Sequence, residues 1–198
     1  MSASATRTEI VAAADGLFYR QGYEHTSFAD ISEAVKISRG NFYYHFKTKD
    51  EILDAVIVAR LQKTQTMLDR WEKIGETPHA RILSFLHILI ANRADIKRYG
   101  CPVGTLTAEL AKLGHAAQDE ANKLFSMFRI WLRGQFDLLG CKNADSLALH
   151  ILARSQGIAT LANAFKDEAF IRREVADLEA WLQKVTDDVQ PRQRARKS

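Results

Sequence analysis

Apolar residues recur at helical spacing along nearly the whole chain. The first such segment covers residues 6–20 and ends before Gly22, with an apolar face of Ile10, Ala13, Ala14, Leu17 and Phe18. Thr6 and Glu9 have the spacing of a capping box, which predicts that a helix starts at Thr6. The alternation that is typical of strands is weak throughout, so we expect an all-helical fold.

Residues 26–49 predict two short helices that are joined by a tight turn. Ser27 is a suitable N-cap with Asp30 three residues later, and Phe28, Ile31 and Val35 follow at helical spacing.

Lys36 and Ile37 mark the break between the two helices. Ser38 caps the second helix, in which Phe42 and Phe46 lie one turn apart and face inward.

The remaining apolar pattern predicts longer helices. A capping box of Thr48 and Glu51 opens a helix that extends to about residue 73. Helices are further expected at residues 78–92, from Cys101-Pro102 through residue 110, and at about 116–139, 144–165 and 167–185. Residues 93–100 are polar and are interpreted as a loop.

The outer face of the second short helix has the chemistry of a DNA-reading surface. It carries Arg39, Gly40, Asn41, Tyr43, Tyr44 and His45. Such side chains can donate to base edges or phosphates, and glycine allows close approach of the backbone. Lys47 and Lys49 follow, where a cation can pair with phosphate. The alternative is an ordinary helical hairpin with a solvated aromatic face.

Residues 6–53 resemble the DNA-binding domain of the TetR family of bacterial repressors. The matching positions are Ile10, Ala13, Ala14, Leu17, Phe18, Gly22, Tyr23, Thr26, Ser27, Ile31, Ala34, Ser38, Arg39, Gly40 and residues 42–47. Lys36 departs from the pattern, because the family usually has glycine in this turn. A positive φ at a lysine costs about 1 to 2 kcal/mol.

The resemblance implies an all-α fold in which a three-helix helix-turn-helix domain is joined by a long helix to a larger ligand-binding and dimerisation domain. We expect a DNA-binding domain at residues 1–50, an effector and dimerisation domain at 51–188, and a basic disordered tail at 189–198. The DNA contacts are assigned to Thr26, Ser27, Ser38, Arg39, Gly40, Asn41, Tyr43, Tyr44, His45, Lys47 and Lys49. The last two long helices are expected to form a homodimer that binds an inverted-repeat operator.

The family also implies a small-molecule effector, for which the aromatic content of the second domain suggests a hydrophobic compound. The candidate lining residues are Phe85, Leu89, Tyr99, Cys101, Phe125, Phe128, Arg129, Trp131 and Ile158, with Glu109 and His87 as further polar anchors. Each of the apolar candidates is also an ordinary core position.

Cys101 has a second interpretation as a sensor of oxidants or electrophiles. It stands beside a predicted helix start, where the helix dipole and the nearby Lys97 and Arg98 would favour a thiolate. The alternative is that it fills a tight corner as a small apolar residue.

The composition excludes some classes of function but does not itself indicate one. The net charge of +4 over 198 residues equals the charge of four cations in the tail, so no basic domain is indicated. Two cysteines and the lack of a signal-peptide pattern fit the cytoplasm. The histidines lack ligand spacing and no catalytic motif occurs, so we expect no metal, no cofactor and no enzyme activity. A helical small-molecule-binding protein or enzyme with a vestigial DNA-binding head is the alternative.

Overall fold

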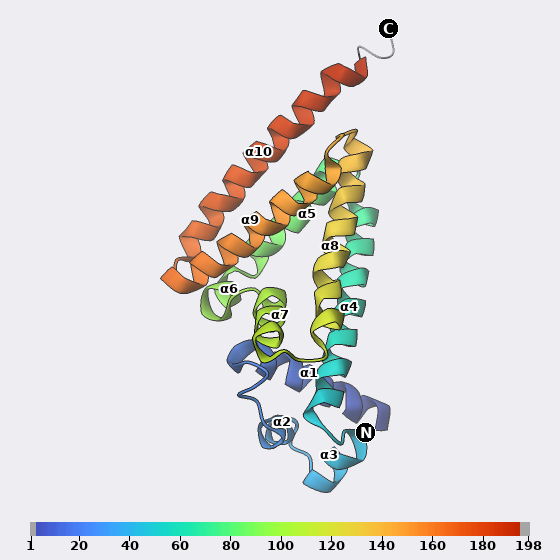
Figure 1. Ribbon diagram of the computed structural model, residues 1–198, viewed down its shortest axis with the longest axis vertical. Helices are drawn as coiled ribbons and strands as arrows, with labels where there is room; N and C mark the ends of the chain where they lie inside the picture. Colours follow the sequence, from blue (N-terminus) through green and yellow to red (C-terminus); the bar gives the residue numbers. More distant parts are fainter. Residues whose placement is uncertain (1–2, 195–198) are drawn as a thin grey trace. The chain divides into compact units, whose positions relative to one another are not determined.

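The computed structural model describes the backbone of residues 3–194 and the side chains of residues 4–189. The described residues form helices and connecting turns without any strand, which confirms the expected all-α fold (Figure 1). In chain order the helices are α1 (Ala3–Gln21), α2 (Phe28–Val35), α3 (Arg39–His45), α4 (Lys49–Ile74), α5 (Pro78–Ala91), α6 (Arg93–Tyr99), α7 (Pro102–Leu113), α8 (Gln118–Leu139), α9 (Ala144–Phe165) and α10 (Glu168–Arg194).

The helices form two compact units. Unit 1 contains residues up to 64 together with 102–124, and unit 2 contains residues 65–101 together with the chain from 125 onward. These units do not coincide with a boundary at residue 50, because α7 and the first turns of α8 pack with α1 to α4. The functional division into domains at residues 1–50 and 51–188 stays a prediction.

Unit 1 has its own hydrophobic core. Figure 1 shows α1, α2 and α3 grouped around the beginning of α4, with α7 beside α1. The fully buried side chains come from all these helices and include Ile10, Ile31, Phe42, Phe46, Ile52, Leu53, Ile57 and Leu110. The helix-turn-helix therefore rests on a core to which distant parts of the sequence contribute.

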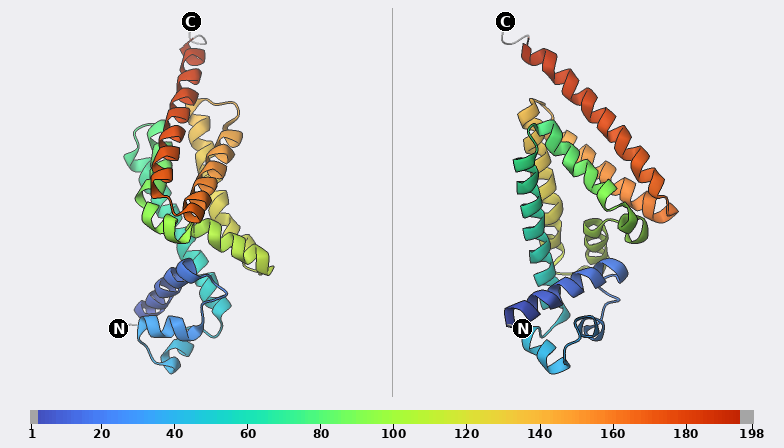
Figure 2. Two further views of the ribbon diagram at one scale, coloured as in Figure 1. Left: turned by 90° about the vertical axis from the view of Figure 1, so that its left-hand side faces the viewer. Right: turned by 180° about the vertical axis from the view of Figure 1, so that it is seen from behind.

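Unit 2 is a helical bundle. α9 and α10 run antiparallel, and both pack against α5 (Figure 2). Its core combines aromatic residues of α4, α5 and α8 with the small face of α9, where Ala148, Ala159 and Ala162 are buried. Small side chains allow helices to approach closely.

Two predicted boundaries were wrong at the ends of the described chain. α1 begins at Ala3 rather than at Thr6, which is buried inside the helix and is not its cap. α10 continues to Arg194 instead of ending near Val185, because Val189 extends the apolar stripe and packs on the core. The predicted tail at 189–198 is thus partly helical, and its residues 195–198 lie outside the described residues.

The predicted loop at residues 93–100 was also wrong, because this segment forms α6. Ile96 is its one fully buried side chain, so the sequence shows no apolar period. Tertiary ion pairs hold the helix instead: Arg93 Nε lies 2.6 Å and Lys97 Nζ 3.5 Å from the carboxylate of Glu168 on α10.

Candidate nucleic-acid interface

α2 is delimited by the residues that the sequence indicated. The Ser27 side chain accepts a hydrogen bond from the Asp30 amide at 3.2 Å, and Asp30 Oδ2 accepts one from the Ser27 amide at 2.7 Å. This capping box lowers the pKa of the Asp30 carboxyl, mainly through the backbone hydrogen bond from Ser27. Lys36 ends the helix in the left-handed region, with φ 56° and ψ 41°. The turn has the expected geometry although it lacks glycine.

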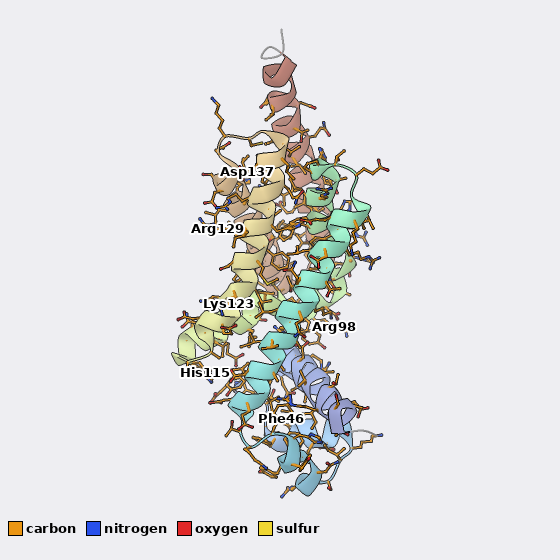
Figure 3. The ribbon with its side chains drawn as sticks, turned by 90° about the vertical axis from the view of Figure 1, so that its right-hand side faces the viewer. Phe46, Arg98, His115, Lys123, Arg129 and Asp137 are labelled. Carbon is orange, nitrogen blue, oxygen red and sulfur yellow. The ribbon has the colours of Figure 1, made fainter. Side chains whose placement is uncertain are left out.

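A capping serine and two buried phenylalanines fix the position of α3. Ser38 caps it by accepting a hydrogen bond from the Asn41 amide at 3.3 Å. Phe42 and Phe46 are each 1% exposed, and the guanidinium of Arg7 lies 4.3 Å from the centre of the Phe46 ring. Figure 3 labels Phe46 among the helices of unit 1. Burial of both rings fixes which face of α3 points outward.

The outward face carries the predicted reading residues. Ser38, Arg39, Gly40 and Asn41 are exposed, and Tyr44 is 72% exposed. These side chains can reach a partner molecule without any change in the fold.

Tyr43 is held more firmly than its neighbours on this face. It is 48% exposed, and its ring stacks on that of Phe28 with the centroids 5.5 Å apart. Phe28, Ser32, Arg39 and Tyr43 line a pocket between α2 and α3. The stacking presents the phenol edge of Tyr43 in a fixed orientation.

Four assigned residues do not lie freely on this face, and one of them is Lys47, whose Nζ donates to the Tyr43 carbonyl. Thr26 is 1% exposed and its hydroxyl donates to the Gly22 carbonyl at 2.6 Å. Lys49 Nζ donates to the Tyr23 carbonyl at 3.0 Å and lies 4.2 Å from the centre of the Tyr23 ring. His45 is half-buried. The side chains of Thr26 and Lys49 thus serve the fold of unit 1.

Known proteins share both the sequence and the fold of this interface. Residues 10–56 match the family described as bacterial regulatory proteins, tetR family. An uncharacterized HTH-type transcriptional regulator of Lactococcus lactis subsp. lactis is 34% identical over 123 residues, which cover 61% of this chain and 63% of that protein. Residues 10–56 thus match the DNA-binding segment of the TetR family, and the fold resembles that of a solved TetR-family regulator.

Two further regulators are similar to this chain, one in sequence and one in structure. The regulator TtgR of Pseudomonas putida is 40% identical over 55 residues, covering 28% of this chain and 26% of TtgR. A TetR transcriptional regulator from Legionella pneumophila has a crystal structure that is similar with a TM-score of 0.77 and 25% identity, over 89% of this chain and 94% of that one. The chain thus spans about 63% and 26% of the lengths of the two sequence relatives. The structural likeness to the Legionella pneumophila protein covers 89% of this chain.

Sequence reasoning missed a polar network behind the reading helices. Tyr23 donates its hydroxyl to Asp50 Oδ1 at 2.5 Å, and His115 Nε2 lies 3.6 Å from the same oxygen. Burial and the hydrogen bond to Asp50 raise the pKa of Tyr23, whereas the Tyr23 hydroxyl lowers the pKa of Asp50. Glu109 accepts the amides of Tyr23 and Glu24 at 2.9 Å each. No sequence signal linked these residues, because they are distant in the sequence; Tyr23 and Glu109 are 86 positions apart.

The predicted effector residues separate into two groups. Phe85, Leu89, Phe128, Trp131 and Ile158 lie in one buried cluster of unit 2. Its rings are in contact, with centroids 5.4 Å apart for Phe85 and Phe128. Tyr99 and Phe125 are half-buried.

The aromatic cluster also contains Trp71, which the sequence prediction left out. Its ring centroid is 5.5 Å from that of Trp131. The indole N–H of Trp131 donates to Glu72 at 3.0 Å. A pair of tryptophans with one bound polar group therefore forms the centre of this cluster.

The predicted polar anchors have other partners. Arg129 is exposed on α8 and forms two hydrogen bonds with Asp145, at 2.8 and 2.6 Å (Figure 3). His87 Nε2 contacts Glu179 at 2.6 Å on an exposed surface. Glu109 belongs to unit 1, where it binds the amides of Tyr23 and Glu24.

Cys101 is half-buried and packs against the apolar cluster of unit 2. Lys97, expected to favour its thiolate, lies 3.5 Å from Glu168 instead. Cys141 is buried, and burial raises the pKa of its thiol.

Neither a metal-binding cluster nor a membrane span occurs among the described residues. They contain no group of three His, Cys, Asp or Glu side chains that would bind a metal ion. None of the described helices combines the length and hydropathy of a membrane span.

Proposed function

We propose that this chain is a cytoplasmic homodimeric transcriptional regulator, acting as a repressor, that inserts α3 into the DNA major groove. The observation that carries the proposal is the two-sided character of α3: Phe42 is buried, while Arg39, Asn41 and Tyr44 are exposed on the opposite face. The first residues of a recognition helix contact base edges in this type of motif. Arg39 and Asn41 then lie nearest the bases, and Lys47 faces the phosphates.

Dimerisation through α9 and α10 is supported by apolar residues that the single chain leaves exposed. Phe165 is 73% exposed, and Leu149 and Leu161 are each 43% exposed on α9. A Cβ built on Gly157 would meet no atom within 4 Å, so this face of α9 has room for another helix. Two reading helices related by a two-fold axis bind an inverted repeat.

DNA binding is tested by selecting an operator from a random duplex library and measuring affinity by fluorescence anisotropy. Arg39→Ala and Tyr44→Ala are expected to weaken binding by roughly 1 to 3 kcal/mol, about tenfold to a hundredfold, because each removes one groove contact. Arg70→Ala is the charge-matched control, since Arg70 is exposed on α4 within unit 2. Equal affinity of all four proteins would exclude α3 as the reading helix.

Release by a small hydrophobic effector is supported by the aromatic cluster of unit 2. A compound that binds beside Trp71 and Trp131 will change their fluorescence and lower operator affinity. The test is a titration of aromatic compounds that follows tryptophan emission and DNA anisotropy together, with Trp131→Phe as the variant. An effector that releases DNA equally well from that variant, with unchanged affinity, would place its binding site elsewhere.

Sensing of electrophiles through Cys101 is the competing release mechanism. The position next to α7 supports it, whereas the pairing of Lys97 with Glu168 removes one source of thiolate stabilisation. The two mechanisms differ in a direct test with a thiol-reactive electrophile. Loss of DNA binding in the wild type but not in Cys101→Ser would favour the thiol sensor over the effector.

A further inference from the structure

Polar contacts fasten α7 to the helices of the DNA-binding head at three points, all within unit 1. At its start, the Pro102 carbonyl accepts a hydrogen bond from Arg60 at 2.6 Å, and Arg60 also binds Asp15 of α1 at 2.6 Å. Near its end, Glu109 binds the turn between α1 and α2. Just after it, His115, labelled in Figure 3, faces Asp50 at the first turn of α4.

The contact of Glu109 differs from the other two contacts in what it binds. Pro102 and His115 contact the side chains of Arg60 and Asp50, whereas Glu109 binds backbone amides. Its two carboxylate oxygens each accept one amide, from Tyr23 and Glu24, at 2.9 Å. Charge-assisted hydrogen bonds of this kind are stronger than neutral ones. The fit is close, since Gly22 has φ +91° and a Cβ built there would lie 3.0 Å from the nearer oxygen.

The turn that Glu109 binds determines where α2 begins. The Thr26 amide donates to the Tyr23 carbonyl at 3.2 Å, and the Thr26 hydroxyl donates to the Gly22 carbonyl at 2.6 Å. Ser27, the N-cap of α2, follows directly. The orientation of α2 therefore depends on a turn whose amides are bound by a residue 85 and 86 positions away.

Two apolar neighbours of Glu109 on α7 pack in the core of unit 1. Leu106 and Leu110, on either side of it along α7, are 3% and 0% exposed in the core that contains Phe42 and Phe46 of the reading helix. Those phenylalanines set the outward face of α3. One segment of α7 thus contacts both the turn before α2 and the core beneath α3.

We propose that Glu109 is a positioning residue for DNA binding, which acts by fixing the turn between α1 and α2. The DNA-binding unit then extends beyond residues 10–56 to include α7. This proposal rests on the proposed function, since it assumes that α3 reads DNA.

The test compares Glu109→Gln with Glu120→Gln. In the first variant an amide N–H₂ replaces one acceptor and faces a backbone donor, so one hydrogen bond is lost and a donor meets a donor. Glu120 pairs with Lys123 on α8, so its substitution causes the same change in charge without touching the turn. We measure amide hydrogen exchange at Tyr23 and Glu24, and anisotropy with the operator selected on the wild type, at a temperature where circular dichroism shows each protein folded.

In Glu109→Gln, both amides are expected to exchange about tenfold faster and operator affinity to fall about tenfold. Glu120→Gln is expected to leave the exchange of both amides unchanged and not to weaken operator binding. The sign of the affinity change separates positioning from electrostatics, because removing a negative charge from a DNA-binding unit would by itself tighten binding. A role in stability alone would leave the affinity of the folded variant at the wild-type value.

The possible failures are distinguishable. Wild-type affinity in Glu109→Gln, with or without faster exchange, overturns the positioning role and leaves the proposed function intact. A wild-type protein that selects no sequence from the library overturns the proposed function, and the positioning role falls with it.

Discussion

Replacing Lys36 with glycine should stabilise the protein, because this lysine ends α2 in the left-handed region. Its φ is 56° and its ψ 41°, and its amide donates to the Glu33 carbonyl at 3.1 Å. A left-handed conformation costs an L-residue about 1 to 2 kcal/mol. Glycine relieves this strain but loses about 0.5 to 1 kcal/mol more than alanine in backbone entropy. The expected net gain in the free energy of unfolding is about 0.5 to 1 kcal/mol.

Urea unfolding followed by circular dichroism measures this gain at a fixed chain concentration. Lys36→Ala is the control, because it removes the same charge and flexible side chain while keeping the strained Cβ. Lys166 ends α9 with φ 54°, so Lys166→Gly and Lys166→Ala repeat the comparison in unit 2. If each glycine variant unfolds at the same urea concentration as its alanine counterpart, backbone strain does not explain these two turns.

Three other properties follow from particular contacts. Gly75→Ala should destabilise unit 2 by about 1 to 3 kcal/mol, because the new Cβ would lie 2.5 Å from Arg81 Cγ and 2.9 Å from the Trp71 carbonyl oxygen. In the same denaturation assay, Gly134→Ala should stabilise the protein by up to about 1 kcal/mol, because its new Cβ meets open space on α8. Because the pKa of Asp50 is lowered and that of Tyr23 is raised in the folded state, stability should fall below about pH 4 and again above about pH 10. Tyr23→Phe should flatten both limbs of this pH profile in thermal denaturation, and an unchanged profile would exclude the pair as its source. Leu161→Glu should raise the dimer dissociation constant in analytical ultracentrifugation without unfolding the chain, since this leucine is 43% exposed on α9; an unaltered dimer would exclude that face.

Local signals predicted most of the fold correctly because they act within a few residues. The side chains of Ser27 and Ser38 each accept an amide three residues on, whereas Lys36 and Lys166 end α2 and α9 through backbone hydrogen bonds to the preceding turn. The start of α1 was placed too late for a related reason. Thr6 has a capping partner three residues on, but the residues before it are also compatible with a helix, so the signal lay inside the element.

The errors elsewhere came from partners distant in the sequence. α6 has a polar sequence, and its Arg93 and Lys97 pair with Glu168 on another helix, which no local signal indicates. Glu109 was likewise considered only as a polar anchor for an effector, because nothing in its own segment indicates that it binds the amide of Tyr23. A polar residue is not part of the apolar repeat that predicts a helix, so its role depends on the tertiary contact that satisfies its hydrogen bonds or charge.

In the candidate interface, too, the residue type alone does not show which side chains are available to contact DNA. Lys49 and Tyr44 are both residue types that suit DNA, yet Lys49 Nζ donates to the carbonyls of Tyr23 and Glu24, while Tyr44 is 72% exposed. Loss of the lysine would therefore remove the donor of the Glu24 carbonyl, leave the Tyr23 carbonyl with the Thr26 amide alone, and disturb the turn that precedes α2. Weaker DNA binding by Lys49→Ala would consequently report on the turn as much as on a phosphate contact. Only substitutions on the outer face of α3, such as Tyr44→Ala, separate recognition of DNA from the integrity of the structure that presents it.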